Sequence, residues 1–286
     1  MRAAIAVILC TFLVAPDAAA RSRVVRAPSS VQRIFLVILE NQDADAALRR
    51  PFVQRLIAGG GLLANYHCIT HPSQPNYIAL AAGSTWGVKD DATADLDVPH
   101  LGDLFDAHGV SWKVYAERYP GGCFLGHNAD NLLYVRRHVP FLGFANMQKN
   151  PARCAAHVVN ASLLDADIAT GELPAYSMYI PDQEHNGHDT GGDIADSWMA
   201  SRFGSLLNDP RFMDGTLFIL TFDESDSNSN TRIATIFYGV GVKRGSSSVK
   251  FYNHYDLLRT IEELLHVPTL GQEDLKQGER ITDVLY

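Results

Sequence analysis

Signatures of several common protein classes are missing from this sequence. It has no Gly-x-Ser-x-Gly elbow, no Walker loop and no Gly-x-Gly-x-x-Gly, which argues against an α/β-hydrolase esterase and against nucleotide or dinucleotide cofactors. Lys and Arg number 24 against 32 Asp and Glu, so the basic face expected of a nucleic-acid-binding protein is not predicted. The 22 Gly and 13 Pro residues follow no period, which excludes collagen-like and low-complexity chains.

The first twenty residues have the composition of a leader segment. Met1 and Arg2 give a short positive start, residues 3–14 are apolar, and three alanines at 18–20 offer a cleavage site. The apolar run is too short to span a bilayer, and no second run of about twenty apolar residues follows. We expect a signal peptide over residues 1–20 and a secreted or periplasmic mature chain without a transmembrane anchor. A buried N-terminal strand or helix is the alternative.

The rest of the chain alternates short apolar runs with amphipathic stretches. Residues 34–39 form a β-branched-rich run, as in a strand buried on both faces of a parallel sheet. Further strands are predicted at residues 62–68, 112–115, 176–180, 217–222 and 233–240, and helices from Pro51 to about 59 and at 76–82, 101–108, 194–207 and 255–265. This alternation predicts an α/β fold with a mainly parallel sheet. No linker divides residues 21–286, so we expect one domain in which the polar stretch 118–160 is an insertion that caps the sheet.

Four cysteines are present, and Cys10 is lost with the signal peptide. In an oxidising compartment the other three are expected to form one disulfide and to leave one thiol. Cys68 lies in an apolar run and is expected to be a buried thiol. Cys123 and Cys154 both lie in polar, irregular sequence, so we expect the disulfide to join them.

Two of the predicted strands run directly into acidic residues. Glu40 and Asn41 follow the first strand, and Asp223 and Glu224 follow the strand at 217–222. The carboxyl ends of strands form the edge of an open α/β sheet where ligands bind. Carboxylates gathered there repel one another unless a cation neutralises them, and an all-oxygen set suits Mg²⁺, Ca²⁺ or Mn²⁺ better than Zn²⁺. The alternative is that these acids only end the strands and cap the following helices.

A serine precedes the predicted helix at 76–82. Pro75 is expected at the first helical position, which places Ser73 just outside the helix N-terminus. Unpaired N–H groups and the helix dipole favour an anion there. Beside a cation, such a serine can ionise and act as a nucleophile. An ordinary Ser/Pro helix start is the alternative.

The loop after the strand at 176–180 contains two histidines. His185 and His188 have a spacing that can suit zinc, and Asp189 could orient His188. An acid/base role for one of them, with the other at the surface, is an equally open interpretation. His254 precedes the last predicted helix and is either a further polar group of the site or a helix-start residue.

With these residues in place, the chain resembles the secreted acid phosphatase and phospholipase C family of metal-dependent phosphoesterases, within the alkaline-phosphatase-like superfamily. It is most similar to bacterial secreted acid phosphatases of about this length. The motifs that carry the resemblance are Glu40-Asn41, the segment from His71 to Tyr77, the loop ending at His188-Asp189, and the segment from Thr221 to Glu224. Trp112-Lys113 and the segments from Tyr115 to Glu117, Arg136 to Phe141 and Asn253 to Tyr255 also match, in order along the mature chain.

The resemblance implies an alkaline-phosphatase-like three-layer sandwich and one divalent ion held by Glu40, Asn41, Ser73, Asp223 and Glu224. It implies that Ser73 is also the nucleophile, that His188 and His254 line the phosphate pocket, and that Asn76 contacts phosphate. Together with His185 and Asp189, Asn76 and His254 are the substrate-binding candidates.

We therefore expect an exported, metal-dependent phosphomonoesterase of the acid phosphatase type that works through a phosphoserine intermediate. His188 is the expected general acid for the leaving group. The expected substrate is a phosphorylated small molecule or a phosphoinositide-like compound. Two alternatives remain open: a phospholipase C or other phosphodiesterase that uses the same residues, and a secreted, non-catalytic metal-binding protein. The sequence does not predict the oligomeric state.

Overall fold

The computed structural model describes residues 31–286. The signal peptide expected over residues 1–20, together with Cys10, lies outside the described residues. Between residues 31 and 286, no helix combines the length and the apolar character needed to cross a bilayer.

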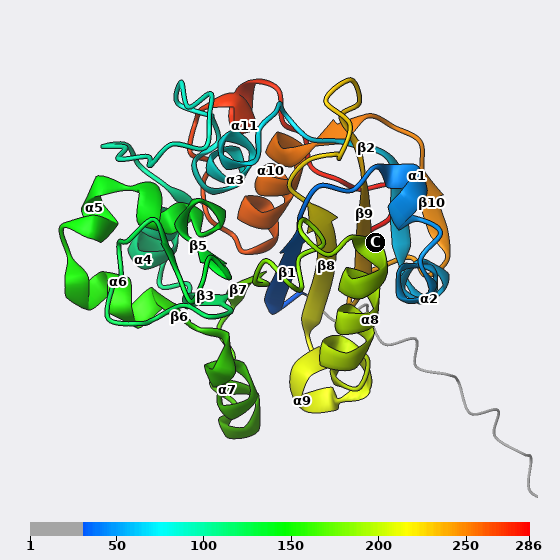
Figure 1. Ribbon diagram of the computed structural model, residues 1–286. Helices are drawn as coiled ribbons and strands as arrows, with labels where there is room; N and C mark the ends of the chain where they lie inside the picture. Colours follow the sequence, from blue (N-terminus) through cyan, green and yellow to red (C-terminus); the bar gives the residue numbers. More distant parts are fainter. Residues whose placement is uncertain (1–30) are drawn as a thin grey trace, which may run out of the picture.

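A nine-stranded sheet forms the centre of the protein (Figure 1), in the order β10-β2-β9-β8-β1-β7-β3-β6, with β11 also paired to β2. Its strands are β1 (Arg33–Leu39), β2 (Gly61–His67), β3 (Trp112–Ala116), β6 (Val158–Asn160), β7 (Tyr176–Ile180), β8 (Thr216–Phe222), β9 (Arg232–Gly239), β10 (Ser246–Ser248) and β11 (Tyr252–Asn253). The pairings in this sheet are parallel except those of β9, which runs antiparallel to β8 and β2. The mainly parallel sheet expected from the sequence is confirmed.

Strand β1 lies between β7 and β8. Its residues from Ile34 to Leu39 and all of β8 are buried, as expected for apolar runs that helices cover on both faces. The register pairs Leu39 with Phe222 at the carboxyl ends of these two parallel strands. The next residues, Glu40 and Asp223, therefore leave the sheet side by side.

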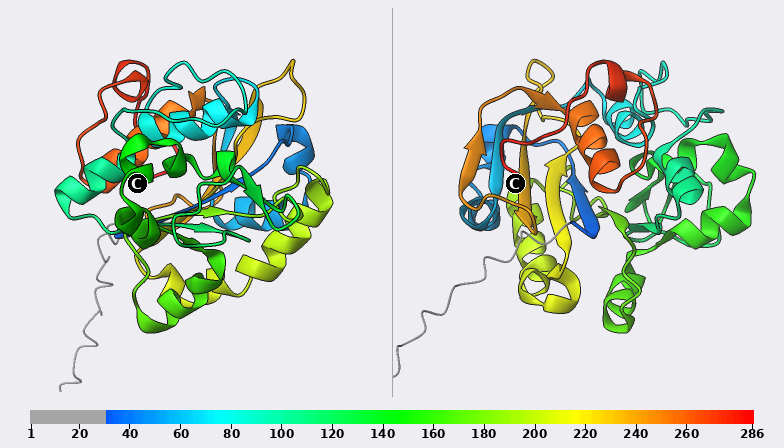
Figure 2. Two further views of the ribbon diagram at one scale, coloured as in Figure 1. Left: turned by 60° about the vertical axis from the view of Figure 1, so that its left-hand side comes forward. Right: turned by 180° about the vertical axis from the view of Figure 1, so that it is seen from behind.

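Helices cover both faces of the sheet. Figures 1 and 2 show α3 and α10 on one side and α2 and α8 on the other. The helices outside the 118–160 stretch are α1 (Ala44–Ala47), α2 (Pro51–Gly59), α3 (Ser73–Ala82), α4 (Leu101–His108), α7 (Leu164–Thr170), α8 (Gly192–Phe203), α9 (Pro210–Met213), α10 (His254–Leu264) and α11 (Glu273–Lys276), with 3-10 turns at Ala161–Leu163 and Leu206–Asn208. This three-layer arrangement confirms the predicted fold class.

Helix α3 starts earlier than the sequence indicates. It begins at Ser73, with Pro72 at its N-cap, and ends before Gly83, which has a left-handed backbone (φ 67°). Pro75, expected at the first helical position, is the third residue of the helix. Because the first N–H groups of a helix have no intrahelical acceptor, proline is accepted throughout that turn and does not mark its first residue. Ser73 is therefore inside the helix rather than just outside it.

The polar stretch 118–160 lies beside the β3–β6 end of the sheet (left in Figure 1). It contains β4 (Asn128–Ala129), β5 (Tyr134–Val135), 3-10 turns at Arg136–His138 and Pro140–Gly143, α5 (Ala145–Gln148), α6 (Pro151–His157) and β6. Its last residues contribute β6 as an edge strand of the sheet, paired in parallel with β3. The turn at Arg136–His138 packs against α3, which brings this stretch next to the helix that begins at Ser73.

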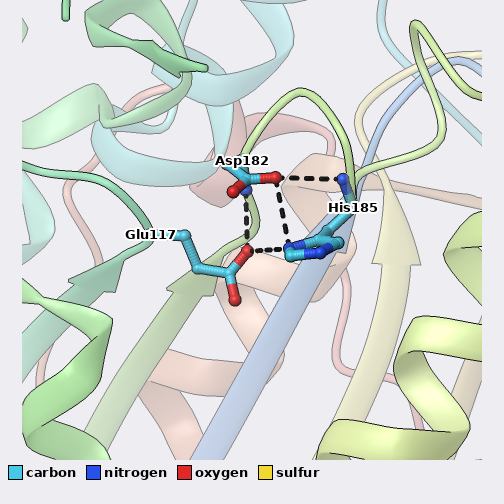
Figure 3. Close-up of side chains that lie close together, drawn as sticks. All are labelled: Glu117, Asp182 and His185. Atoms are coloured by element: carbon cyan, nitrogen blue, oxygen red, sulfur yellow. Dashed lines mark hydrogen bonds and ion pairs between the residues drawn. The ribbon is translucent and has the colours of Figure 1, made fainter. Parts of the chain in front are cut away.

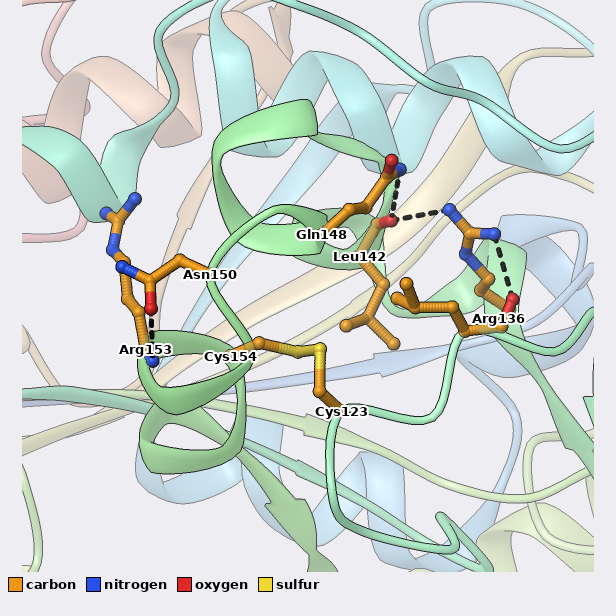
Figure 4. The surroundings of a disulfide bond; sticks show 8 residues. Cys123, Arg136, Leu142, Gln148, Asn150, Arg153 and Cys154 are labelled. Carbon is orange, nitrogen blue, oxygen red and sulfur yellow. Dashed lines mark hydrogen bonds between the residues drawn. A yellow bond between two sulfur atoms is a disulfide. The ribbon is translucent and has the colours of Figure 1, made fainter.

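A disulfide joins Cys123 to Cys154 on α6, with their Cα atoms 5.3 Å apart (Figure 4). Cys68 is a buried free thiol. Burial raises the pKa of this thiol to about 12, so it is not a reactive thiolate at neutral pH. Both expectations for the cysteines are confirmed.

Removing this disulfide should lower the stability of the protein. The bridge joins residues 31 apart in sequence, and the chain-entropy relation gives about 3–4 kcal/mol for a loop of that size. We expect the double variant Cys123→Ser/Cys154→Ser to lose about this free energy of unfolding in urea titrations. As a control, the wild type under reducing conditions should unfold at the midpoint of the double variant. Peptide mapping of the unreduced protein that found Cys68 in a disulfide would contradict the pairing.

Candidate active site

The side chain of Ser73 faces oxygen atoms from two strand ends. Its Oγ lies 3.2 Å from Glu40 Oε2, 3.1 Å from Glu224 Oε1 and 3.5 Å from Asn41 Oδ1. Glu40 and Asn41 follow β1, and Glu224 follows β8 after Asp223. The structure thus brings together the serine and the acidic strand ends singled out in the sequence, although they come from three separate parts of the chain.

These oxygen atoms have few hydrogen-bond donors around them. The Ser73 hydroxyl has one hydrogen and can donate to only one of its three neighbours. Asp223 Oδ1 accepts the Asn41 N–H (3.1 Å), but Asp223 Oδ2 is buried and receives no hydrogen bond from the described residues. Ser73 Oγ thus lies 3.1–3.5 Å from three other oxygens, a spacing like that of neighbouring ligands around Mg²⁺ or Ca²⁺. A divalent cation would satisfy the unpartnered Asp223 Oδ2, and the residues that would hold it are Glu40, Asn41, Ser73, Asp223 and Glu224.

The three carboxyl groups bind protons more tightly than usual. Burial, followed by the charge of Asp223, raises the pKa of Glu40 well above its usual range. Burial and the charge of Glu224 raise the pKa of Asp223 to about 7. Burial also raises the pKa of Glu224, against the opposing charge of His71. In the absence of a cation the raised pKa values favour protonated carboxyl groups at this site, and a metal ion that bound there would displace those protons.

Two residues of the segment around Ser73 hold the carboxyl groups in place. The Tyr77 hydroxyl donates to Glu40 Oε1 at 2.5 Å. His71 Nδ1 lies 2.5 Å from Glu224 Oε2, and its Nε2 lies 2.9 Å from a backbone carbonyl oxygen. Both His71 contacts are satisfied when Nδ1 and the carboxyl group share a proton. Sequence reasoning assigned neither residue, although Tyr77 follows Ser73 by four residues, a spacing that puts both on one face of a helix.

The 118–160 stretch contributes Arg137 and His138. The ring of His138 is buried and stacks on Tyr77, with 5.3 Å between ring centroids, and its Nε2 lies 3.3 Å from Glu40 Oε1. Burial, followed by the charge of Arg137, lowers the pKa of His138 well below its usual range, so this ring is neutral. Sequence reasoning did not assign either residue, because no pattern in an irregular stretch shows which part of it turns back toward α3.

Two of the expected substrate-binding residues are fully buried and hold the backbone around the site. His254 Nε2 donates to the Asp223 carbonyl oxygen (2.7 Å), and its Nδ1 lies 3.1 Å from the Tyr66 hydroxyl. Burial lowers the pKa of His254 to about 4. The Asn76 amide accepts two backbone N–H groups and donates to two carbonyl oxygens of residues 69–72. Neither side chain therefore has a hydrogen-bonding group left over for a phosphate.

His188 and Asp189 lie on the loop 181–191, which follows β7. His188 Nδ1 contacts Asp189 Oδ1 at 2.6 Å, the arrangement of an imidazole that a carboxylate orients. The loop is attached to the carboxylate site, because the Glu40 N–H donates to the Asn186 carbonyl oxygen (2.9 Å). Since 38% of the His188 side chain is exposed, this imidazole is open to solvent and to a substrate.

His185 belongs to a second cluster on the same loop. Its Nδ1 lies 2.6 Å from Glu117 Oε2 and 3.2 Å from Asp182 Oδ1, and these three atoms could hold a metal ion (Figure 3). The other oxygens of both carboxylates also accept hydrogen bonds, from an arginine and a tyrosine hydroxyl. Because each carboxylate oxygen here has a donor, whereas Asp223 Oδ2 has none, the site around Glu40 has the greater need for a cation.

Comparison with known proteins agrees with this geometry. The Phosphoesterase family matches residues 39–268, a span that includes the residues around Ser73 described above. The chain belongs to this family. It is 33% identical over 257 residues to a probable acid phosphatase of Kluyveromyces lactis, covering 86% of this chain and 61% of that protein. It is 32% identical over 264 residues to an acid phosphatase of Aspergillus fumigatus, covering 88% of this chain and 58% of that protein.

A bacterial relative in this family is nearer to this chain in length. The phosphatidylinositol-3-phosphatase of Mycobacterium tuberculosis is 30% identical over 246 residues, covering 83% of this chain and 78% of that protein. The chain spans about three fifths of the length of the two fungal relatives. The family membership confirms the resemblance seen in the sequence.

Solved structures confirm the alkaline-phosphatase-like fold. A protein of the alkaline phosphatase superfamily from Vibrio parahaemolyticus has a TM-score of 0.60 at 11% identity, covering 90% of this chain and 72% of that one. The phosphonate monoester hydrolase of Agrobacterium radiobacter has a TM-score of 0.58 at 14% identity, covering 91% of this chain and 77% of that one. At these identities the similarity establishes the architecture alone.

Proposed function

We propose that the protein is an exported, metal-dependent phosphomonoesterase of the acid phosphatase type that forms a phosphoserine intermediate. The observation that carries the proposal is the Ser73 hydroxyl at the start of α3, with oxygens of Glu40, Asn41 and Glu224 within 3.5 Å of it. The names of the relatives support a phosphate-ester substrate, either a phosphorylated small molecule or a phosphoinositide-like compound. Export rests on the leader-like composition of residues 1–20.

Ser73 is the nucleophile in this proposal. Glu40, Asn41, Ser73, Asp223 and Glu224 would hold a divalent ion, with Mg²⁺, Ca²⁺ or Mn²⁺ favoured over Zn²⁺ by the all-oxygen ligands. When bound, the ion would supply positive charge that favours the serine alkoxide and offsets the charge of the phosphoryl group. The partial positive charge at the N-terminus of α3 favours the same alkoxide. Ser73 Oγ releases its proton to solvent and forms a bond to phosphorus as the ester oxygen leaves with a proton from His188. Water then attacks the phosphoserine, which releases phosphate and returns a proton to Ser73 Oγ.

His188 is the proposed general acid for the leaving group. Its Nδ1 is held by Asp189 at 2.6 Å, which leaves Nε2 to donate a proton to the ester oxygen. The hydrogen bond from the Glu40 N–H to the Asn186 carbonyl oxygen attaches the loop that carries His188 beside the carboxylates.

The variant His188→Ala should slow phosphate esters according to their leaving group. An alkyl oxide needs a proton in order to leave, so we expect alkyl phosphates to lose about 10²–10⁴-fold in kcat/KM. An activated aryl oxide tolerates negative charge, and its loss should be much smaller. The matched control is His108→Ala, an exposed histidine at the end of α4. Equal losses on both ester types would instead assign His188 to phosphate binding, and no loss would make it a surface histidine.

A metal-reconstituted assay tests the proposed function as a whole. The protein is stripped of metal, reloaded with Mg²⁺, Ca²⁺, Mn²⁺ or Zn²⁺, and assayed on an aryl phosphate and on the matching methyl aryl diester. We expect metal-dependent turnover that favours the monoester, and acid quenching should leave phosphate on the peptide that contains Ser73. Preference for the diester would indicate a phosphodiesterase or phospholipase C instead. Metal binding without turnover of either ester would leave a structural metal site and overturn the proposal.

A further inference from the structure

Arg137, in the turn that packs against α3, is a cation whose hydrogen-bond donors are unused among the described residues. Within residues 31–286, its guanidinium has one ion pair, from Nε to Asp91 Oδ2 at 3.4 Å, and this buried Nε makes no hydrogen bond. The side chain is 19% exposed. The next residue, His138, has its Nε2 3.3 Å from Glu40 Oε1, so Arg137 belongs to the turn that packs beside this carboxylate and against α3.

The preceding arginine shows what a structural role requires in this segment. Arg136 is buried and donates to three backbone carbonyl oxygens and to Asp95, and its bond to the Leu142 carbonyl oxygen is drawn in Figure 4. These bonds join neighbouring turns, so they explain the presence of Arg136 by a structural role. Arg137 makes no comparable set of hydrogen bonds among the described residues, so a structural role of this kind does not explain its presence.

The position of Arg137 is fixed from two directions. His138, the next residue, is fully buried beside the carboxylates. Asp91, which pairs with Arg137, also accepts the Gln74 N–H at 3.0 Å, so one carboxylate connects the residue after Ser73 to the guanidinium. Gln74 and Arg137 line the same recess. The guanidinium is therefore held next to the start of α3 rather than free at the surface.

A phosphate group needs such a cation at this site. Glu40, Asp223 and Glu224 carry three negative charges when ionised, and a divalent ion supplies two positive charges. A phosphate monoester brings about two further negative charges near neutral pH. A fixed positive charge on the substrate side offsets the resulting repulsion and favours the transition state.

We propose that Arg137 binds the non-bridging oxygens of the substrate phosphate group and thereby sets a preference for monoesters over diesters. This inference rests on the proposed function of the same site. A monoester has three non-bridging oxygens and close to two charges, whereas a diester has two such oxygens and one charge. A guanidinium donates two parallel hydrogen bonds to such a group, so its contact with a monoester is the stronger one.

The variant Arg137→Gln tests the inference by removing the charge and the fork of donors. We expect kcat/KM for an aryl phosphate monoester to fall about 10²–10³-fold and kcat/KM for the matching methyl aryl diester to fall less than about 10-fold. Calorimetry of the metal-loaded protein gives a second readout that does not depend on turnover. There the Kd for inorganic phosphate should rise about 10-fold or more, with a smaller change for dimethyl phosphate.

Two further variants separate the charge from its geometry. Arg137→Lys keeps a point charge and should recover part of the monoester rate without restoring the monoester-to-diester ratio. Arg211→Gln, which changes an exposed arginine on α9 at the amino end of β8, should leave both rates and both Kd values unchanged. If Arg137→Gln fails to fold, as judged by its melting temperature, Arg137→Lys decides the question in the same assays.

Equal losses on both esters with unchanged phosphate binding would overturn the inference, and so would an Arg137→Lys variant with the wild-type ester ratio and phosphate Kd. If the wild type hydrolyses monoesters and the Arg137 variants keep its monoester-to-diester ratio, this inference alone is wrong. A wild type that binds inorganic phosphate through Arg137 but hydrolyses no ester contradicts the proposed function alone.

Discussion

Ser73→Ala should lower the turnover of phosphate esters by on the order of 10⁴-fold or more and leave a folded protein. In the proposed reaction Oγ forms the bond to phosphorus, and the carboxylates and the amide around it are proposed metal ligands, so we expect none of them to take over this role. The substitution removes only this atom from a buried position, so the melting temperature of the metal-free protein should change little. Acid-quenched wild type should carry labelled phosphate on the peptide containing Ser73, and the variant should carry none.

The matched control is Ser162→Ala, an exposed serine in the 3-10 turn that precedes α7. It should keep wild-type turnover and wild-type labelling. A folded Ser73→Ala protein with near-wild-type turnover would remove Ser73 from the mechanism, whatever its effect on metal affinity.

Asp223→Asn should have opposite effects on activity and on the stability of the metal-free protein. The substitution removes one carboxylate from the proposed ligand set, so we expect metal affinity to fall and turnover to drop by about 10³-fold or more. The same change removes a buried negative charge that repels Glu40 and Glu224. After chelation, the variant should therefore melt at a higher temperature than the wild type near pH 8.

The pH dependence of this difference follows from the raised pKa of Asp223. Its pKa is about 7 in the folded protein against 3.8 for the free group, so between about pH 4 and 7 the folded state holds a proton that the unfolded state has released. The chelated wild type should lose stability as pH rises through this window, and the variant should lose less. Added metal should raise the wild-type melting temperature more at pH 8 than at pH 5, because it displaces fewer protons there.

Differential scanning calorimetry at pH 5 and pH 8, with and without metal, measures each of these effects. Asp226→Asn changes an exposed carboxylate in the loop that follows and should leave the pH dependence and turnover unchanged. A chelated wild type whose stability is flat between pH 5 and pH 8 would count against the buried, mutually repelling carboxylates.

The centre of the site could be predicted because strand ends are visible in a sequence. A buried parallel strand is a continuous apolar run, so the first polar residues after it, Glu40 and Asp223, mark the carboxyl edge of the sheet. The register of β1 against β8 then places them together. The start of α3 was harder to locate, because proline is accepted throughout the first helical turn. The sequence therefore predicted a helix start that was too late, and Ser73 is the first residue of the helix.

The surroundings of the carboxylates could not be predicted because long-range packing sets them. Nothing near His138 in the sequence indicates that it packs on Tyr77, and nothing near Arg137 indicates a carboxylate neighbour. Long-range packing also sets the orientation of the His254 ring. Its two nitrogens contact the Asp223 carbonyl oxygen and the hydroxyl of Tyr66 on β2. Periodicity identifies which face of an element is apolar, but it does not show where an irregular stretch returns to the sheet.

Two of the proposed metal ligands, Glu40 and Asp223, follow adjacent buried strands, whereas Arg137 lies on the 118–160 stretch. If these residues have the proposed roles, this separation has an evolutionary consequence. Glu40 and Asp223 depend on the register of β1 and β8, which changes only if the core of the sheet is rebuilt. The 118–160 stretch is fastened by the Cys123–Cys154 bridge and by edge-strand pairing, so residues within it can be exchanged without disturbing that register. On the proposed function, descendants of one ancestor are therefore expected to acquire new substrates while they inherit the same proposed centre around Ser73. A mutant library confined to this stretch should likewise yield altered selectivity in proteins that still bind the metal.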